Sequence, residues 1–331
     1  MERRLSFWVI ASTYVGTVVG AGFASGQEVL QFFVSFGLRG LAGLGLTTVL
    51  LIFFGYRLME TGRRLGASSY LAVILENAGP WLGKLLDGVI TFFLFGALLI
   101  MAAGAGALFR QHFGLPFVLG SALLLGATWG TVLAGLGGVI AAISAIAPLL
   151  VISVFGLSLF ALLANWGRLP AALFWELPAR AAVPFWPLAA VIYASYNLIL
   201  AVAVLAPLGA RADSRELLRG AVWGGAILGL AAAAISLAIF ARGTRAAAVE
   251  IPMLAVAAQA GPVVSLGYGA ILLAEIYTTA VSSLYGFGSR LGGPGRPFWL
   301  VVTAATGAAL ALAQLGFSRL VATVFPAVGY A

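Results

Sequence analysis

Long apolar stretches separated by short polar segments run along the whole chain and predict membrane-spanning helices. A helix needs about 20 consecutive apolar residues to cross the hydrocarbon core of a bilayer. The stretches recur at close to this length, whereas a soluble helix carries only one apolar face. The pattern therefore predicts an all-α polytopic membrane protein, and we place its ten spans at residues 7–35, 38–58, 83–108, 115–133, 137–165, 185–207, 217–241, 263–288, 297–315 and 317–331.

The ten spans divide into two sets of five within a single transmembrane domain, residues 1–331. The first repeat is predicted at 1–165 and the second at 185–331, with a connection at 166–184. Because each repeat has an odd number of spans, the second enters the membrane from the opposite side, which is the arrangement of an inverted repeat. The last helix is expected to be short or incomplete.

The first span contains the stretch "GTVVGAGFASGQE", residues 16–28, which places four glycines in a segment surrounded by lipid. Each glycine costs a helix interior about 1 kcal/mol relative to alanine. One interpretation is a face for close helix packing, and the other is a break whose freed N–H and C=O groups bind ions or a carboxylate. In the second interpretation a half-helix begins near Ser25 with Glu28 in its first turn. Glu28 then either caps this half-helix or contacts the ligand.

Polar residues also interrupt the sixth span, in the stretch "VIYASYNLIL". Asn197 lies about as far from the start of this span as Gly20 lies from the start of the first. Inverted repeats place corresponding irregularities in corresponding spans, so a second broken helix is predicted at 193–198.

The eighth span carries Glu275, Thr278, Thr279 and Ser282 at positions i, i+3, i+4 and i+7, which share one face of a helix. An ionisable residue inside a membrane span indicates function by default, because an isolated charge there is costly. Two interpretations remain open. Either the hydroxyls bind a hard cation such as sodium, or Glu275 carries a proton.

These features resemble the LeuT-fold transporters of the amino acid–polyamine–organocation superfamily, and the glycine stretch at 16–28 is most similar to the YkvI-type bacterial membrane proteins. The resemblance implies a five-plus-five inverted repeat with broken helices 1 and 6. It also implies a substrate site beside the two breaks, at Gly20, Ala21, Gly22, Phe23, Tyr193, Tyr196 and Asn197.

The resemblance further implies a sodium site between spans 1 and 8. Its ligands would be the carbonyls of Gly16 and Val19 and the hydroxyls of Thr278 and Thr279, and a second register, Thr279 with Ser282 and Ser283, fits the same spacing. The chain lacks the span 5 lysine of proton-coupled relatives, yet it has Glu275 where the sodium pattern has a small residue. Glu275 and Glu28 therefore stay candidates for proton coupling.

The composition agrees with a membrane protein and excludes other classes. Of all residues 62% are hydrophobic and 8% are charged. The basic residues behind the net charge of +8 are scattered and form no face for a phosphate backbone, so no nucleic-acid partner is expected. The chain has no cysteine and one histidine, so we expect no enzyme activity and no cofactor apart from a sodium ion.

Basic residues are more frequent in the segments on the N-terminal side of the predicted membrane, such as 57–64 and 211–219. By the positive-inside rule, the N-terminus is expected in the cytoplasm. The resemblance to bacterial membrane proteins implies the bacterial inner membrane.

Together with these patterns, the resemblance implies a secondary transporter that moves a small amino acid or related zwitterion by alternating access. Sodium symport is the expected mode of amino acid transport, and proton coupling through Glu275 is the alternative. A channel or a non-transporting membrane sensor is the alternative of another class. The expected partners are the substrate and the lipid bilayer, and a homo-oligomer is left open.

Overall fold

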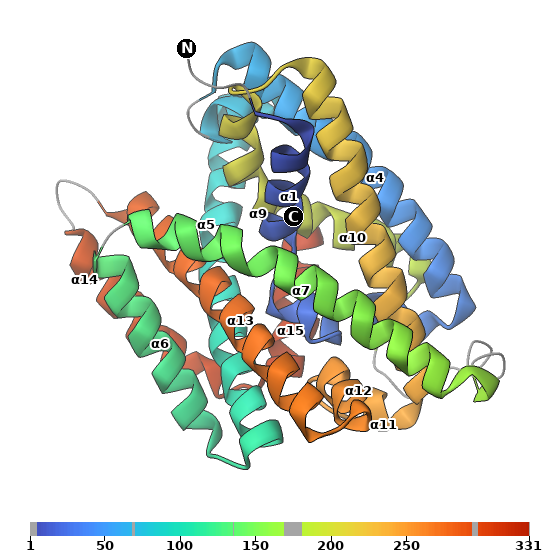
Figure 1. Cartoon of the computed structure of the whole chain (residues 1–331). Helices are drawn as coiled ribbons and strands as arrows, with labels where there is room; N and C mark the ends of the chain where they lie inside the picture. The colour runs from blue at the N-terminus through green and yellow to red at the C-terminus, as the bar shows by residue number, and fades with distance from the viewer. Residues whose placement is uncertain (1–4, 68–69, 135, 169–180, 293–296, 331) are drawn as a thin grey trace.

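The computed structural model describes residues 5–67, 70–134, 136–168, 181–292 and 297–330, and these are almost entirely helical (Figure 1). Part of the predicted connection, 169–180, lies outside the described residues. The helices in chain order are α1 (Phe7–Val18), α2 (Ala21–Ala24), α3 (Gln27–Phe32), η1 (Val34–Phe36), α4 (Leu38–Leu65), α5 (Tyr70–Phe113), α6 (Phe117–Ala134), α7 (Leu136–Ala164), η2 (Trp166–Arg168), α9 (Trp186–Gly209), α10 (Ser214–Arg242), α11 (Thr244–Ala247), α12 (Pro252–Ala260), α13 (Pro262–Leu291), α14 (Phe298–Ala313) and α15 (Phe317–Tyr330).

Each predicted span corresponds to one helix or, for the first span, to the broken series α1, α2, α3 and η1. The helices α14 and α15 form an apolar pair that is bent by 117° between them. Several other apolar helices are shorter than a bilayer requires, so the count of ten spans stays a prediction. Four described helices are long and apolar enough to cross a membrane: Leu38–Leu65, Ala78–Phe113, Ser214–Arg242 and Pro262–Gly288.

The helices form two groups, and each group takes two helices from each half of the chain. One group contains α1, α4, α9 and α10, and the other contains α5, α6, α13 and α14. In Figure 1 the first group lies at the upper right and the second at the lower left, while α7 crosses in front of them. The short helix α15 packs against α5 and α9, between the groups. This sharing of helices is the arrangement that a five-plus-five inverted repeat produces.

Glycines bring α4 and α9 into backbone contact. A Cβ atom at Gly62 would overlap the carbonyl of Ala206, and one at Gly209 would overlap the carbonyl of Met59. Small residues at a helix interface permit this approach in membranes, where dispersion contacts replace the hydrophobic effect as the force between helices. The first group is thus a closely packed unit at this end.

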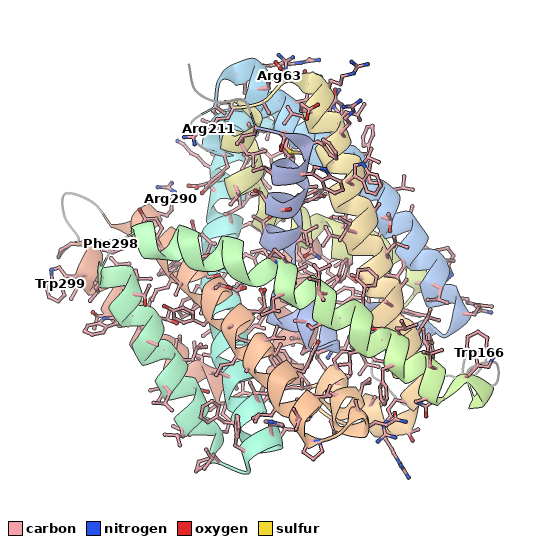
Figure 2. The ribbon with its side chains drawn as sticks, viewed as in Figure 1. Arg63, Trp166, Arg211, Arg290, Phe298 and Trp299 are labelled. Carbon is pink, nitrogen blue, oxygen red and sulfur yellow. The ribbon has the colours of Figure 1, made fainter. Side chains whose placement is uncertain are left out.

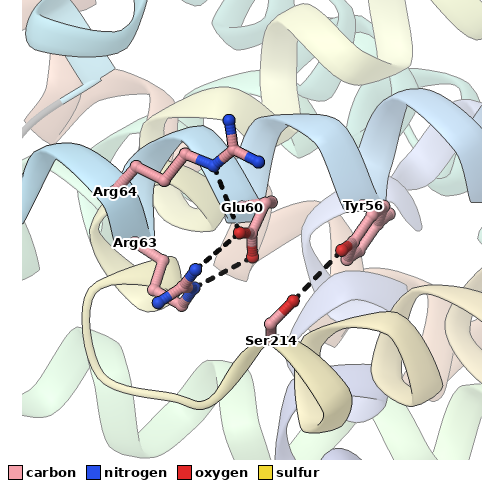
Figure 3. Close-up of polar contacts among 5 residues, drawn as sticks. All are labelled: Tyr56, Glu60, Arg63, Arg64 and Ser214. Atoms are coloured by element: carbon pink, nitrogen blue, oxygen red, sulfur yellow. Dashed lines mark hydrogen bonds and ion pairs between the residues drawn. The ribbon is translucent and has the colours of Figure 1, made fainter.

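The labelled arginines Arg63, Arg211 and Arg290 lie at the same end of the molecule as the N-terminus, and Trp166 lies at the other end (Figure 2). We call the end that carries these arginines the N-terminal end. There, the carboxylate of Glu60 accepts hydrogen bonds from Arg63 at 2.7 and 3.0 Å and from Arg64 at 3.3 Å (Figure 3).

Two further contacts join helices at the N-terminal end. The hydroxyls of Tyr56 and Ser214 lie 3.1 Å apart and connect α4 to α10 (Figure 3). Asp87 on α5 accepts hydrogen bonds from Arg290 on α13, at 2.8 Å, and from Tyr70, at 2.9 Å. Burial and the hydrogen bond to Asp87 raise the pKa of Tyr70 to about 12, so its hydroxyl stays protonated and donates. Glu60 and Asp87 therefore each have an arginine partner.

Candidate functional site

The first span is broken where its glycines predicted a break. The helix α1 ends at Val18, and Val19 is extended, with φ −72° and ψ 116°. A single turn, α2, follows, and the chain then passes through Gly26 at φ +79° before α3 begins at Gln27. The positive φ explains the glycine at this position, because other residues rarely adopt it. The predicted half-helix with Glu28 in its first turn is confirmed.

The break leaves the backbone carbonyls of Gly16 and Val19 without a described donor. The amide of Val19 still donates to Val15, but among the described hydrogen bonds no backbone amide donates to the carbonyls of Gly16 or Val19. In a continuous helix, the amides four residues later would occupy both. These two carbonyls are the predicted sodium ligands of span 1. The prediction needs oxygens without a hydrogen-bond partner, and both meet that condition among the described hydrogen bonds.

The hydroxyls of the eighth span divide into two pairs. Thr278 donates to the carbonyl of Glu275 at 3.0 Å, and Ser282 donates to the carbonyl of Thr278 at 2.9 Å. The hydroxyls of Thr279 and Ser283 have no described partner in the protein. The Thr279 side chain lies against the break, because its Oγ1 and Cγ2 atoms are each 3.7 Å from the position of a Cβ at Gly20. The structure thus brings Thr279 to the break and turns Thr278 and Ser282 toward their own helix.

The face of α13 that carries Thr279 also carries Glu275 and Tyr268. The Tyr268 hydroxyl donates to the carbonyl of Ala24 at 2.5 Å, at the end of α2. Glu275 lies between Tyr268 and Thr279 on this face and is 3% exposed. Its Oε1 has no hydrogen-bond partner among the described residues. Tyr268 was not among the residues predicted from the sequence. It lies seven residues before Glu275, and this spacing places both on one helix face.

The predicted break in the sixth span is wrong, because α9 is continuous from Trp186 to Gly209. The polar side chains that suggested a break are satisfied inside the helix. Asn197 Nδ2 donates to the carbonyl of Tyr193 at 2.9 Å, and Ser195 Oγ donates to that of Val191 at 2.8 Å. No glycine or proline lies between 188 and 206, so nothing in the sequence lowers the cost of a break there.

Glu28 contacts the sixth span and does not cap its own helix. Its Oε2 accepts a hydrogen bond from the Tyr196 hydroxyl at 2.7 Å, and Glu28 is 4% exposed. The carboxyl group packs against Gly22, where a Cβ atom would overlap it. At the start of α3 the Gln27 amide donates to Ser25 Oγ at 3.2 Å, so Ser25 supplies the cap. The interpretation of Glu28 as a cap is therefore wrong.

Aromatic rings surround the contact between Glu28 and Tyr196. Tyr196 stacks on Phe325 of α15, with ring centroids 4.6 Å apart and an interplanar angle of 6°. Tyr193 packs edge-on against Phe33 at 4.9 Å and against Tyr196 at 5.2 Å. We call these rings the aromatic cluster; its members are Phe32, Phe33, Phe93, Tyr193, Tyr196 and Phe325. They come from α3, α5, α9 and α15, so the cluster lies where the two groups meet.

Most of the predicted substrate residues are buried. Phe23, Tyr193, Tyr196 and Asn197 are buried, whereas Gly20 is partly exposed. Ala21 is the first residue of α2, and its side chain is outside the described part of the structure. The site thus combines a helix break, two carboxylates and a set of rings.

Within the described residues, no group of three or more His, Cys, Asp or Glu side chains could hold a metal ion. The oxygens gathered at the break are backbone carbonyls and a neutral hydroxyl. This donor set suits a monovalent hard cation better than a transition metal.

No protein-family model matches the chain. The uncharacterized membrane protein YkvI of Bacillus subtilis is 31% identical over 327 residues, which cover 97% of this chain and 91% of YkvI. The uncharacterized protein YyaD of the same organism is 30% identical over 317 residues, which cover 95% of this chain and 90% of YyaD.

Solved structures with the LeuT fold superimpose on nearly the whole chain. A manganese transporter of Eremococcus coleocola matches with a TM-score of 0.65 and 16% identity, covering 99% of this chain and 78% of the transporter. MhsT in complex with L-phenylalanine matches with a TM-score of 0.65 and 18% identity, covering 99% and 88%. A Na+-coupled sialic acid symporter matches with a TM-score of 0.61 and 14% identity, covering 99% and 75%. The chain therefore has the LeuT fold.

Proposed function

Because the chain belongs to the YkvI family of membrane proteins and its structural neighbours are secondary transporters, we propose that it is an ion-driven secondary transporter of a small amino acid or related zwitterion. The observation that carries the proposal is the break in span 1. The break leaves the carbonyls of Gly16 and Val19 without a described backbone donor. It also meets the α13 face that carries Thr279 and the buried Glu275, through Gly20 and Ala24.

Sodium is the coupling ion that these oxygens favour. The carbonyls of Gly16 and Val19 and the hydroxyl of Thr279 would supply neutral oxygen ligands, and Glu275 a negative charge nearby. Ser283 extends this set, because its buried hydroxyl is on the same face as Thr279 and has no described partner. The ligand pattern thus favours Thr279 and Ser283 over Thr278 and Ser282, whose hydroxyls are engaged in their own helix.

Proton coupling is the second candidate, and one observation favours it. Glu275 is buried, and its Oε1 has no described partner, so the carboxyl group needs either a bound cation or a proton to be stable. Both mechanisms neutralise the same group, and they differ in which ion does so.

The transported solute would bind beside the break, between span 1 and α9. MhsT, which matches nearly the whole chain, was solved with L-phenylalanine, and this supports an amino acid as the solute. In alternating access, the two helix groups would move against each other around this site.

The test is uptake of labelled amino acids into proteoliposomes, with sodium and proton gradients imposed separately. We expect an inward sodium gradient to drive accumulation above the external concentration, and its collapse to release the solute. Accumulation driven only by the proton gradient would show that the proton is the coupling ion, and Glu275 would then be its carrier. If neither gradient drives accumulation of any solute, the transporter proposal is contradicted.

A further inference from the structure

Two of the buried carboxyl groups, which we call the central carboxylates, have no basic partner among the described residues. Four carboxylates are buried among the described residues, and two of them, Glu60 and Asp87, pair with arginines at the N-terminal end. The other two, Glu28 and Glu275, take part in none of the described ion pairs. No lysine or arginine is among the buried side chains that the structure describes. Because an isolated buried charge is costly, each central carboxylate needs a proton or a cationic ligand.

The two central carboxylates make different contacts. Glu275 is on the α13 face that meets the break, where the proposed coupling ion would neutralise it. Glu28 instead packs on Gly22 and bonds to Tyr196 of α9, within the aromatic cluster. Its hydrogen-bond partner is thus a tyrosine hydroxyl of the aromatic cluster.

This combination of groups suits an organic ammonium. A carboxylate accepts charge-assisted hydrogen bonds from N–H donors, and aromatic faces attract a cation through their quadrupole. The Tyr193 hydroxyl is a second acceptor, because it is 2% exposed and has no partner among the described residues. A carboxylate group at the same place would be repelled by Glu28 and would lose its hydration. The orphaned hydroxyl and the uncompensated carboxylate therefore point to the same kind of ligand.

We propose that Glu28, with Tyr193 and Tyr196, forms a subsite for the ammonium group of the transported solute. Transport then requires an ammonium group on the solute, whereas a carboxylate is dispensable, and simple organic amines are substrates or competitors. This inference rests on the proposed transport function and assigns the residues that select its substrate. Tyr196 is the positioning residue, since its hydroxyl fixes one oxygen of Glu28 and its ring stacks on Phe325.

Three series of matched solutes test the subsite, each differing by one charged group. Each series contains an amino acid, the amine left when its carboxyl group is removed, and the acid left when its amino group is removed. The series are alanine, ethylamine and propionate; leucine, isoamylamine and isocaproate; phenylalanine, phenethylamine and hydrocinnamate. The purified full-length protein is heated with each solute, and the shift of its unfolding midpoint gives the affinity. Competition with amino acid uptake in proteoliposomes gives the second readout.

We expect at least one amine to stabilise the protein and to compete with uptake, and its matched acid to do neither. Glu28→Gln should lower the affinity for the amine by about tenfold or more, because it removes a charge-assisted contact. Tyr196→Phe, which keeps the ring, should lower the affinity for the amine less. Glu76→Gln, at an exposed carboxylate of α5, is the matched control and should leave the affinity unchanged.

Two outcomes would overturn the subsite. One is that no solute with an ammonium group stabilises the wild-type protein while an acid does. The other is that Glu28→Gln folds, as judged by its unfolding midpoint, and binds amines as tightly as the wild type. If Glu28→Gln fails to fold, Tyr196→Phe decides by its amine affinity. Gradient-driven uptake that persists with unchanged selectivity in either variant would overturn this inference and leave the transporter proposal standing.

Discussion

Gly22 leaves no room for a side chain, because a Cβ atom there would overlap the carboxyl group of Glu28. The glycines of span 1 therefore have different structural roles. Gly26 provides a positive φ, and Gly22 leaves space for the carboxyl group of Glu28. The motif indicated the break from the sequence, but the contact with Glu28 was not visible there. Neither was the hydrogen bond from Tyr196, which joins residues 168 positions apart.

The first prediction concerns Gly22→Ala. The added methyl group should displace the Glu28 carboxyl group, abolish uptake and lower the free energy of unfolding by about 1–3 kcal/mol, as overpacking does. Gly126→Ala is the matched control, because Gly126 is in α6 with nothing within 4 Å of a Cβ. Thermal unfolding and uptake, measured on both variants, check the prediction. Equal behaviour of the two variants would contradict the packing seen at Gly22.

The second prediction separates two neighbouring hydroxyls on α13. Thr279→Ala should raise the sodium concentration for half-maximal uptake by about tenfold, because it removes a free oxygen beside the break. Thr278→Ala should change it far less, since this hydroxyl is bonded to the carbonyl of Glu275. Sodium titration of initial uptake rates measures both. A larger effect at Thr278 than at Thr279 would show that the ion uses the other register.

Among the elements, the two broken helices expected from the sequence had different outcomes. The first span breaks because glycine adopts non-helical torsions at little cost. Its freed carbonyls are tolerated because they are buried in protein and not exposed to lipid. The sixth span carries polar residues only, and a helix satisfies such side chains through its own carbonyls, as Asn197 does with Tyr193. Polarity within a span thus indicated a helix that contacts the first span, through Tyr196 and Glu28, but the wrong backbone conformation. The deciding feature was the absence of glycine and proline between 188 and 206.

The third prediction concerns the contact between α4 and α9. Gly62→Ala should force these helices apart, since the new Cβ would overlap the carbonyl of Ala206. We expect a loss of about 1–3 kcal/mol in unfolding free energy and a lower unfolding midpoint in detergent. Gly45→Ala, on the same helix with nothing within 4 Å of its Cβ, should not lower it. If both variants unfold alike, the close approach at Gly62 contributes nothing to stability.

Over the whole molecule, the apolar periodicity predicted the order of the helices, and the resemblance predicted the LeuT fold that the solved structures confirm. The packing of the helices into two groups, with α15 between them, depends on contacts between distant segments that no local pattern encodes. The site lies where the groups meet, since the aromatic cluster takes Tyr196 from one group, Phe93 from the other and Phe325 from α15. Relative motion of the groups would therefore change access to the site.

Gly20 offers the most direct measurement of that access. The chain has no cysteine, so Gly20→Cys creates a single reactive thiol. The position accepts a side chain, because the nearest atoms to a Cβ there, on Thr279, are at ordinary contact distance, 3.7 Å. A membrane-impermeant maleimide is applied to each side of oriented membranes, with and without sodium. We predict that the thiol reacts from both sides and that sodium accelerates labelling from one side while slowing it from the other. Labelling from one side only, whether or not sodium is present, would contradict alternating access at the broken first helix.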